Sequence, residues 1–368
     1  MTAPRWDTAG CYAVADGVHR IPLPMPGDGL RAINVYALDT PDGLALIDGG
    51  WNVPGALEQL QAALSSIGRG VNEIHDVFVT HIHRDHYTLA VEMRRRFGTR
   101  VHLGESEAPG LAAVRQLGSN VPVDSLRELH RAGAPQLAAV AAELTRAEPF
   151  DASGWAPPDQ WIEPGEIRIG SRRLLAIATP GHTKGHLVFH DEEAGLLFAG
   201  DHVLPTITPS IGFELGDWDL PLVRFLDSLT MLLERPDARL LPAHGAPGDS
   251  VHTRIRELLQ HHTGRFSTIM SVVASMPGAT AYQVAQRLEW TRRDVALDRL
   301  DGFNQMIAVC ETLAHLDALV ESGRLSVRRR RGVERFEVCS PGAESQRSVD
   351  PASRWFSAIP DRAAMARR

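Results

Sequence analysis

The chain has 368 residues with a formal net charge of −7, and 43% of its residues are hydrophobic and 23% charged. This length favours roughly two domains, and the composition is that of an ordinary globular protein. The acidic balance argues against attraction of nucleic acid over the whole surface, and no apolar run reaches the roughly 18 residues of a membrane span.

The cysteines and the N-terminus bear on the cellular compartment. Cys11, Cys310 and Cys339 are odd in number and widely spaced, so they predict neither a disulfide framework nor a Cys-x-x-Cys metal site. The first ten residues lack the basic-then-apolar pattern of a secretory signal. We therefore expect a cytoplasmic protein in a reducing environment.

The first hundred residues predict strands that alternate with helices. Apolar runs at 33–38 and 44–47 flank an Asp-Thr-Pro-Asp-Gly turn, which is typical of a β-hairpin. A helix is expected at about 54–66, where leucines recur at helical spacing. A buried strand should follow at 77–79, and a helix should start near Tyr87.

The loop after the strand at 77–79 concentrates four potential metal ligands within six residues. Its sequence from 80 to 86 is Thr-His-Ile-His-Arg-Asp-His. In an extended chain alternate side chains share a face, so His81, His83 and Asp85 would point one way and His86 elsewhere. One short loop could thus serve two neighbouring metal positions. The alternative is a polar loop with solvated histidines.

Residues 105–160 interrupt the strand–helix alternation with helical patterns. Segments of this length between strands are often lids or binding elements. A helical layer that only packs on the core is an equally good interpretation. Strands resume at 166–169 and 173–178, and the second leads into Thr-Pro-Gly-His-Thr-Lys-Gly-His at 179–186.

The following elements again end in polar side chains. A strand at 196–199 leads into Gly-Asp-His, and a short strand at 239–241 leads into Pro-Ala-His-Gly. Helices are expected at about 220–234 and 251–275.

The pattern changes after residue 276. Residues 280–290 and 306–322 predict helices, and a β-ribbon with the arginine run 328–331 follows them. Helices followed by a ribbon suggest a small winged-helix-like domain. The tail at 341–368 is rich in Ser, Pro, Arg and Ala, and we expect it to be disordered at least in part.

Seven candidate metal ligands share one position, since each lies at or just beyond the C-terminal end of an apolar strand. They are His81, His83, Asp85, His86, His182, Asp201 and His244. Layered α/β folds collect functional side chains at that edge. Imidazoles and carboxylates without cysteine suit zinc, with iron or manganese as alternatives. Seven ligands are too many for one tetrahedral ion and suit two ions about 3.5–4 Å apart that share a bridging carboxylate.

Such a pair of ions predicts hydrolytic chemistry. A water shared by two divalent cations has its pKa lowered toward neutrality, which gives a hydroxide nucleophile at ordinary pH. The ions also polarise the oxygen of the electrophile. The expected reaction is hydrolysis of an ester-like, amide-like or phosphodiester bond.

The motifs His-x-His-x-Asp-His, Gly-His-Thr-x-Gly-His, Gly-Asp and a strand-final His-Gly resemble the metallo-β-lactamase superfamily in content and order, over about residues 15–262. The resemblance implies an α/β fold, the αββα sandwich, with its metals at one edge of the sheets. It implies that the first metal is bound by His81, His83 and His182, and the second by Asp85, His86 and His244.

The resemblance also implies roles for single residues. Asp201 would bridge the two metals, and Asp85 would in addition orient or deprotonate the bridging water. Asp48 would support the histidine loop from behind the ligands; its alternative is to cap the turn before Gly-Gly. Tyr87 stands where the family usually has a small residue, so it would either donate a proton to a leaving group or, as we favour, pack. Lys184 stands where proline is common.

The C-terminal part resembles, more loosely, the group of this superfamily that carries a winged-helix-like domain and includes lactamase-beta-like protein 2. The implied organisation is a catalytic domain at 1–262 with the insertion at about 105–160, a helical linker and winged-helix-like domain at 263–340, and the tail. Some members of the group cut single-stranded RNA, and others are glyoxalase II-like thioester hydrolases.

We therefore predict a binuclear metal-dependent hydrolase that uses a metal-bridging hydroxide on a small-molecule thioester, ester or lactone. The alternatives are a single-strand-specific endoribonuclease, with Arg328–Arg331 on phosphates, and a non-catalytic metal-binding protein of the same fold. Because Lys184 is the only lysine, the arginine run also fits an exposed ribbon or a dimer contact. We expect a small-molecule partner ahead of nucleic acid and no membrane contact, and analogy leaves open a homodimer formed through the C-terminal domain.

Overall fold

The computed structural model describes residues 5–27, 29–146, 150–213, 219–291 and 294–339. The chain divides into two compact units. The first unit comprises Met1–Leu117, Asp151–Pro209 and Arg235–Arg254, and the second comprises Gly118–Phe150, Ser210–Glu234 and Ile255–Arg368. The tail predicted at 341–368 lies outside the described residues. The domain boundaries expected near 262 and 340 stay predictions.

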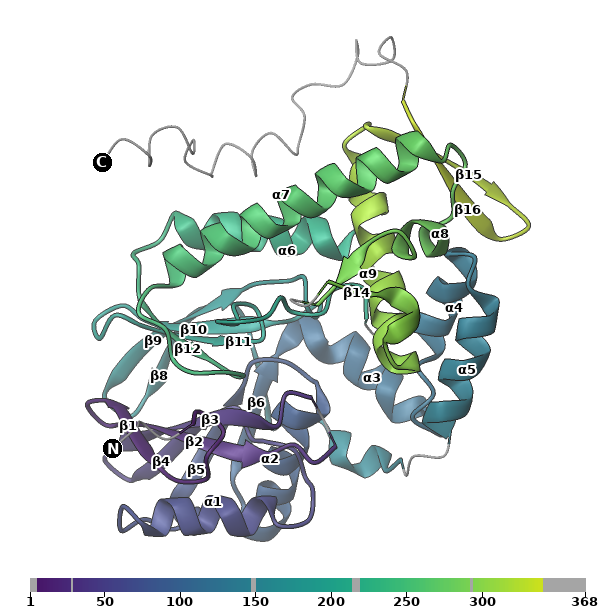
Figure 1. Cartoon of the computed structure of the whole chain (residues 1–368). Coiled ribbons are helices and arrows are strands. Elements are labelled where there is room, and N and C mark those ends of the chain that lie inside the picture. The colour runs from purple at the N-terminus through teal and green to yellow at the C-terminus, as the bar shows by residue number, and fades with distance from the viewer. Residues whose placement is uncertain (1–4, 28, 147–149, 214–218, 292–293, 340–368) are drawn as a thin grey trace, which may run out of the picture. The chain divides into compact units, whose positions relative to one another are not determined.

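The first unit contains a seven-stranded sheet in which strands that follow each other in the chain lie side by side (Figure 1). Its strands in order are β1 (Tyr12–Ala15), β2 (Val18–Pro24), β3 (Ala32–Thr40), β4 (Gly43–Ile47), β5 (Ile74–Val79), β6 (Arg100–Gly104) and β7 (Gln160–Ile162). The pairs from β1 to β4 are antiparallel, and those from β4 to β7 are parallel. The hairpin predicted at 33–47 is confirmed as β3 and β4.

Parallel neighbours need crossover connections, and helices provide them. Helix α1 (Ala56–Ser65) and the helical turn η1 (Val71–Glu73) connect β4 to β5. Helix α2 (Arg84–Phe97) connects β5 to β6. The segment between β6 and β7 that belongs to the first unit holds η2 (Glu105–Glu107), α3 (Ala108–Gln116) and η3 (Ala152–Trp155).

The second sheet of the first unit has five strands. Their order is β12 (Arg239–Pro242), β11 (Leu196–Gly200), β10 (Leu187–Asp191), β9 (Arg172–Ala178) and β8 (Gly165–Ile169), with only β11 and β12 parallel. Alternate apolar side chains of both sheets meet in one buried core. In it Tyr36 packs edge-on against Phe198, and Phe78 against Phe189. The predicted α/β class is confirmed, with two sheets packed face to face.

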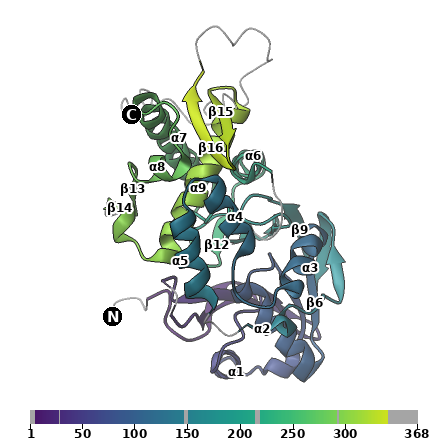
Figure 2. The same ribbon diagram turned by 90° about the vertical axis from the view of Figure 1, so that its right-hand side faces the viewer.

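The second unit is mainly helical. It holds α4 (Val123–Arg131), α5 (Pro135–Arg146), α6 (Pro221–Leu233), most of α7 (Val251–Ser275), α8 (Ala281–Ala285), η4 (Leu297–Arg299) and α9 (Gly302–Glu321). It also holds the short pair β13 (Glu289–Trp290) and β14 (Val295–Ala296) and the hairpin of β15 (Leu325–Arg330) and β16 (Val333–Val338). Helix α9 is central, since it packs against α4, α5, α6, α8 and β15 (Figure 2). The winged-helix-like assignment stays a prediction.

The segment at 105–160 divides between the two units. Helices α4 and α5 pack against α9, and Arg131 of α4 forms ion pairs with Asp317 of α9 and Glu334 of β16. These contacts support the packing interpretation for α4 and α5, while the lid interpretation stays a prediction. Among the helices of the described residues, none is both long and apolar enough to span a bilayer.

Candidate metal centre

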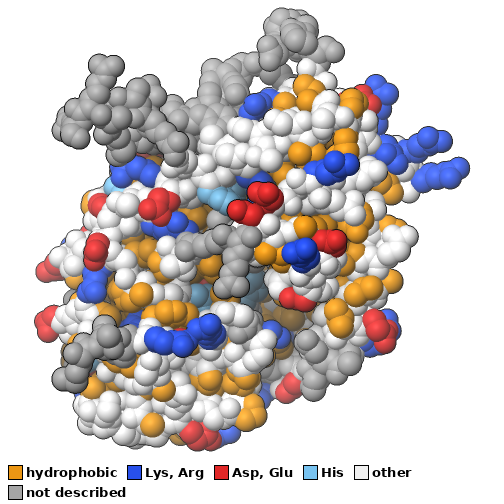
Figure 3. Space-filling model, viewed as in Figure 1, with side chains coloured by type: hydrophobic (Ala, Val, Ile, Leu, Met, Phe, Trp, Pro, Cys, Tyr) orange, Lys and Arg blue, Asp and Glu red, His pale blue; other side chains and the backbone are white. Residues whose placement is uncertain are grey.

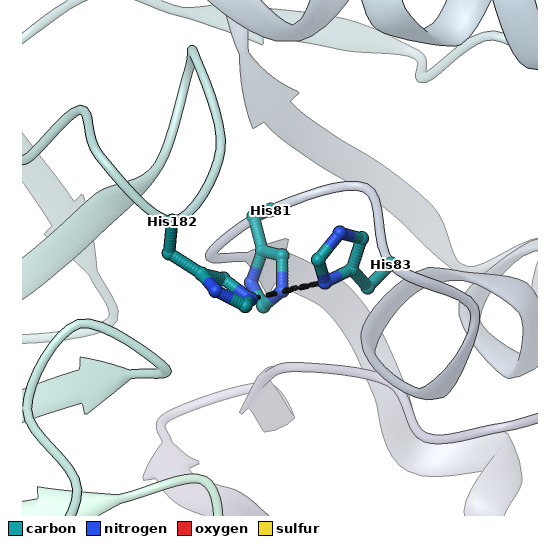
Figure 4. A group of neighbouring side chains, drawn as sticks. All are labelled: His81, His83 and His182. Atoms are coloured by element: carbon teal, nitrogen blue, oxygen red, sulfur yellow. Dashed lines mark hydrogen bonds between the residues drawn. The ribbon is translucent and has the colours of Figure 1, made fainter. Parts of the chain in front are cut away.

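Three histidines from two loops converge on one point (Figure 4). Nε2 of His81 and Nε2 of His182 each lie 3.0 Å from Nδ1 of His83. His81 and His83 follow β5, and His182 lies in the loop between β9 and β10. Nitrogens that bind one tetrahedral zinc ion at about 2.0–2.1 Å stand about 3.3 Å apart. The spacing of the three rings therefore fits a single ion.

The histidine loop is extended only as far as His83. Helix α2 begins at Arg84, and His83 precedes it with β-region backbone angles. The expected helix start near Tyr87 and the extended placement of Asp85 are therefore wrong, because both Asp85 and His86 lie in the first helical turn. Successive side chains of a helix diverge by about 100°, so Asp85 and His86 point in different directions, and the ring of His86 packs on that of His81 with centroids 4.0 Å apart.

Asp85 and His86 form a second group with His244, which follows β12. Oδ2 of Asp85 lies 3.5 Å from Nε2 of His86 and 3.2 Å from Nε2 of His244. Both nitrogens are buried and have no hydrogen-bond partner within the described part of the chain. Unpartnered polar atoms in a protein interior are costly, and a cation bound between them would remove that cost.

Asp201, at the end of β11, lies between the two groups. Its Oδ1 is 3.3 Å from Nε2 of His244 and 3.6 Å from Nε2 of His86, whereas its Oδ2 is 3.5 Å from Nε2 of His182. Oδ1 is buried and has no hydrogen-bond partner among the described residues. One carboxylate thus faces both groups, which fits a bridge between two cations. The seven predicted ligands all lie together, and their assignment to metals stays a prediction.

The two groups differ in their electrostatics. Burial, followed by the neighbouring His182, lowers the pKa of His83 to about 3, and burial lowers the pKa of His81 well below its usual value. Burial also opposes charge on His244, but Asp201 and Asp85 outweigh it and raise the pKa of His244 to about 10. Although burial acts against it, proximity to His244 and His86 holds the pKa of Asp201 well below its usual range. Because ionised carboxylates and neutral imidazoles are the metal-binding forms, an ion bound at the second group would replace the proton of His244.

The residues behind the ligands fix which ring nitrogen faces the centre. Oδ2 of Asp48 lies 3.0 Å from Nδ1 of His86, and Oδ1 accepts hydrogen bonds from N and Oγ1 of Thr80. Nδ1 of His244 donates to the carbonyl oxygen of Ala32 at 2.8 Å. Each contact leaves Nε2 for the centre. The Asp48 contacts favour the supporting role over turn capping.

Two buried residues near the centre were absent from the predicted set. Nε2 of His186 accepts a hydrogen bond from the backbone N–H of Asp201 at 3.2 Å. This histidine closes the Gly-His-Thr-Lys-Gly-His motif, which is the signal that could have identified it. Glu107 accepts a hydrogen bond from Thr183, and burial raises the pKa of Glu107 to about 7. No sequence signal marks Glu107, because it lies in a stretch whose pattern indicates only a helix.

Tyr87 lies on the buried side of α2 and is 0% exposed. Its hydroxyl donates to the carbonyl oxygen of Ala156 at 2.7 Å, and burial raises its pKa. This geometry favours packing over proton donation to a leaving group.

Comparisons of the sequence find relatives in one superfamily. A family model described as the metallo-beta-lactamase superfamily matches residues 28–244. The probable metallo-hydrolase YqjP of Bacillus subtilis (strain 168) is 26% identical over 316 residues, which are 82% of this chain and 90% of that protein. Lactamase-like protein nscB of Aspergillus fumigatus is 27% identical over 157 residues, 38% of this chain and 44% of that protein.

Solved structures are similar over most of the chain. A metallo-beta-lactamase family protein of Thermus thermophilus matches with a TM-score of 0.71 and 26% identity, covering 89% of this chain and 100% of that one. A beta-lactamase domain protein from Burkholderia ambifaria matches with a TM-score of 0.72 and 25% identity, covering 92% and 98%.

Proposed function

The chain belongs to the metallo-beta-lactamase superfamily and is a metal-dependent hydrolase, and we propose that it uses two divalent ions, zinc in the first place, to hydrolyse a small-molecule thioester, ester or lactone. One observation carries this proposal. Seven imidazole and carboxylate side chains from separate segments converge, and three of their buried atoms have no partner among the described residues. Such a donor set suits two borderline cations better than one.

Two bound ions would supply a hydroxide nucleophile at neutral pH and polarise the carbonyl oxygen of the substrate. One ion would be held by His81, His83 and His182, the other by Asp85, His86 and His244, and Asp201 would contact both. The protein positions these groups from the ends of β5, β9, β11 and β12 and from the first turn of α2.

Asp85 would be the group that handles the proton. Burial opposes its charge, but the neighbouring His86 and His244 hold its pKa well below the usual value, so it is ionised. It would accept the remaining proton of the attacking hydroxide once the new C–O bond has formed. It would then return that proton to the leaving thiolate or alkoxide as the C–S or C–O bond breaks, so that one water converts a thioester into an acid and a thiol.

The nuclease alternative has one observation in its favour. Arg328 to Arg331 are exposed where β15 turns into β16, and Figure 3 shows Lys and Arg side chains projecting there at the right of the molecule. One carboxylate of the same hairpin offsets part of this charge, since Nη2 of Arg328 lies 3.7 Å from Oε2 of Glu337. We therefore rank a small-molecule substrate first.

The test is a parallel hydrolysis screen with protein purified without chelator. Its substrates are acyl-CoA and acyl-glutathione thioesters, lactones and single-stranded RNA, and His83→Ala serves as the blank. We expect about two equivalents of metal and turnover of at least one of the small molecules. A metal content below about 1.5 equivalents would contradict the binuclear centre. Turnover of RNA alone would reverse the ranking, and activity that survives in His83→Ala would place the chemistry elsewhere.

A further inference from the structure

Glu107 is a buried carboxylate that the proposed hydrolysis does not use. It is the last residue of η2, directly after β6, and its side chain is 0% exposed. Its Oε1 accepts a hydrogen bond from Oγ1 of Thr183. The backbone N–H groups of Ile82 and Gly185 also favour its charged form. Its Oε2 is buried and has no hydrogen-bond partner among the described residues, so the donors near the carboxylate offset the cost of its burial only in part.

The partners of Glu107 belong to the two loops that carry the three-histidine group. Ile82 lies between His81 and His83, and Thr183 directly follows His182. Glu107 therefore joins one loop to the other within the first unit. The rings that Figure 4 shows converging come from these two loops.

Close packing around glycines confirms how tightly η2 fits between the loops. A Cβ atom at Gly185 would lie 2.3 Å from the backbone N of Glu107, and one at Gly104 would lie 2.6 Å from the carbonyl oxygen of Gly185. A Cβ atom at Gly110 would lie 2.8 Å from Cδ1 of Ile82. A Cβ atom at Gly104 or Gly185 would clash with backbone atoms, and one at Gly110 would displace the end of the Ile82 side chain, so the segment from β6 to α3 approaches both loops directly.

The carbonyl side of Ile82 is held as well. Nε1 of Trp155, in η3, donates to the carbonyl oxygen of Ile82 at 3.2 Å. The carbonyl oxygen of the residue between the two histidines thus has a donor from the segment that follows β6, and its side chain packs against that segment at Gly110. This arrangement limits rotation of the His81 and His83 backbone.

We propose that Glu107 is a positioning residue of the metal centre: by tying Ile82 to Thr183 it holds the ring nitrogens of His81, His83 and His182 at the spacing of one ion. This inference rests on the proposed metal-dependent function. It has a selective consequence, because the contacts of Glu107 adjoin His81, His83 and His182, whereas Asp85 and His86 lie in the first turn of α2 and His244 is held by the carbonyl oxygen of Ala32. Loss of its contacts should loosen the ion of the three histidines and leave the ion at Asp85, His86 and His244 in place.

The test uses Glu107→Gln and Thr183→Val with two matched controls. Thr183→Ser keeps the hydroxyl, and Glu105→Gln changes an exposed carboxylate of the same helical turn. Each full-length protein is loaded with Zn²⁺ alone, and its transfer to a chromophoric chelator is followed together with thermal unfolding. We expect the wild type and both controls to release two ions slowly. Glu107→Gln and Thr183→Val should release one of the two roughly tenfold faster or more.

Three outcomes would overturn the proposal. The first is that Glu107→Gln and Thr183→Val release both zinc ions at the wild-type rate. The second is that they release both ions faster by the same factor and have a lowered Tm, which indicates a purely structural role. If Glu107→Gln does not fold, Thr183→Val decides, since it replaces only the hydroxyl with a methyl group of similar size. Release at the wild-type rate by Thr183→Val is then the third outcome. A wild-type protein that binds fewer than about 1.5 zinc ions would instead refute the binuclear centre itself.

Discussion

The carboxylate of Asp48 lies 3.0 Å from Nδ1 of His86, and both side chains are buried. Because Asp48 occupies Nδ1, the ring presents Nε2 to Asp85 and Asp201. The same carboxylate accepts hydrogen bonds from the backbone and side chain of Thr80. Asp48 therefore orients the ring of His86, a proposed ligand, as carboxylates behind metal-binding histidines commonly do. It also holds Thr80, the first residue of the histidine loop, in place.

Asp48→Asn should lower the affinity for zinc roughly 10–100-fold, because the ring of His86 loses its anionic partner. Asparagine has nearly the same size and tolerates the left-handed backbone at φ 62°, so the change isolates the charge. Competition with a chelator of known affinity measures the effect. Asp42→Asn, an exposed control, should bind as the wild type does. If Asp48→Asn bound zinc with unchanged affinity, Asp48 would not support the metal centre, and capping of the turn would be its remaining role.

Asp201→Asn should reduce the bound metal from about two equivalents to about one. The carboxylate faces His182 with one oxygen and His244 with the other, so removal of its charge weakens the attraction for both ions. We expect kcat to fall roughly 100-fold or more. Metal analysis and initial rates on the substrate found by the screen check this, with the exposed Asp249→Asn as control. Two ions and a normal kcat would exclude Asp201 as a bridge.

Tyr87→Phe should leave kcat within about twofold and lower the free energy of unfolding by about 1 kcal/mol. The hydroxyl is buried and donates to the carbonyl oxygen of Ala156, so its loss removes a structural hydrogen bond. Urea unfolding and initial rates separate the two effects. A fall in kcat of about 100-fold at full metal content would instead support Tyr87 as a proton donor.

Two buried histidines of the second unit predict sensitivity to acid. Nδ1 of His315 donates to the carbonyl oxygen of Glu311 at 2.8 Å, so its Nε2 is left to accept from Nδ1 of His262 at 3.1 Å. Burial lowers the pKa of His315 to about 3 and holds the pKa of His262 well below its usual value. Both rings are therefore neutral in the folded protein.

The unfolded chain binds a proton on each of these histidines below about pH 6.5, and the folded chain does not. The stability they contribute is complete above that pH and falls as the pH drops toward 3, by up to about 1.4 kcal/mol per pH unit for each ring. Urea unfolding in the presence of EDTA, between about pH 7 and pH 4, measures the slope. The double variant His262→Leu/His315→Leu should show a shallower slope. Equal slopes would mean that the pair does not titrate in this range.

Much of the fold could be predicted where apolar residues repeat with a regular period. The hairpin of β3 and β4 and the helices α1 and α7 lie close to where the sequence places them. The predictions failed where no such period exists. Helix α2 begins in the polar run at Arg84, and α8 ends at Ala285, since Glu289–Trp290 pair as a strand with Val295–Ala296 instead of continuing a helix.

The sequence by itself determined the chemistry of the centre, because side chains at the ends of buried strands must meet at one edge of packed sheets. Only the tertiary structure decided how they meet. His83 and His182 are 99 residues apart, and their 3.0 Å contact depends on how two sheets and their loops pack. The same packing gives Asp201 one oxygen for each group and places Glu107, from a segment with no recognisable motif, between the two loops. These positions follow from contacts between distant segments, which no local pattern encodes.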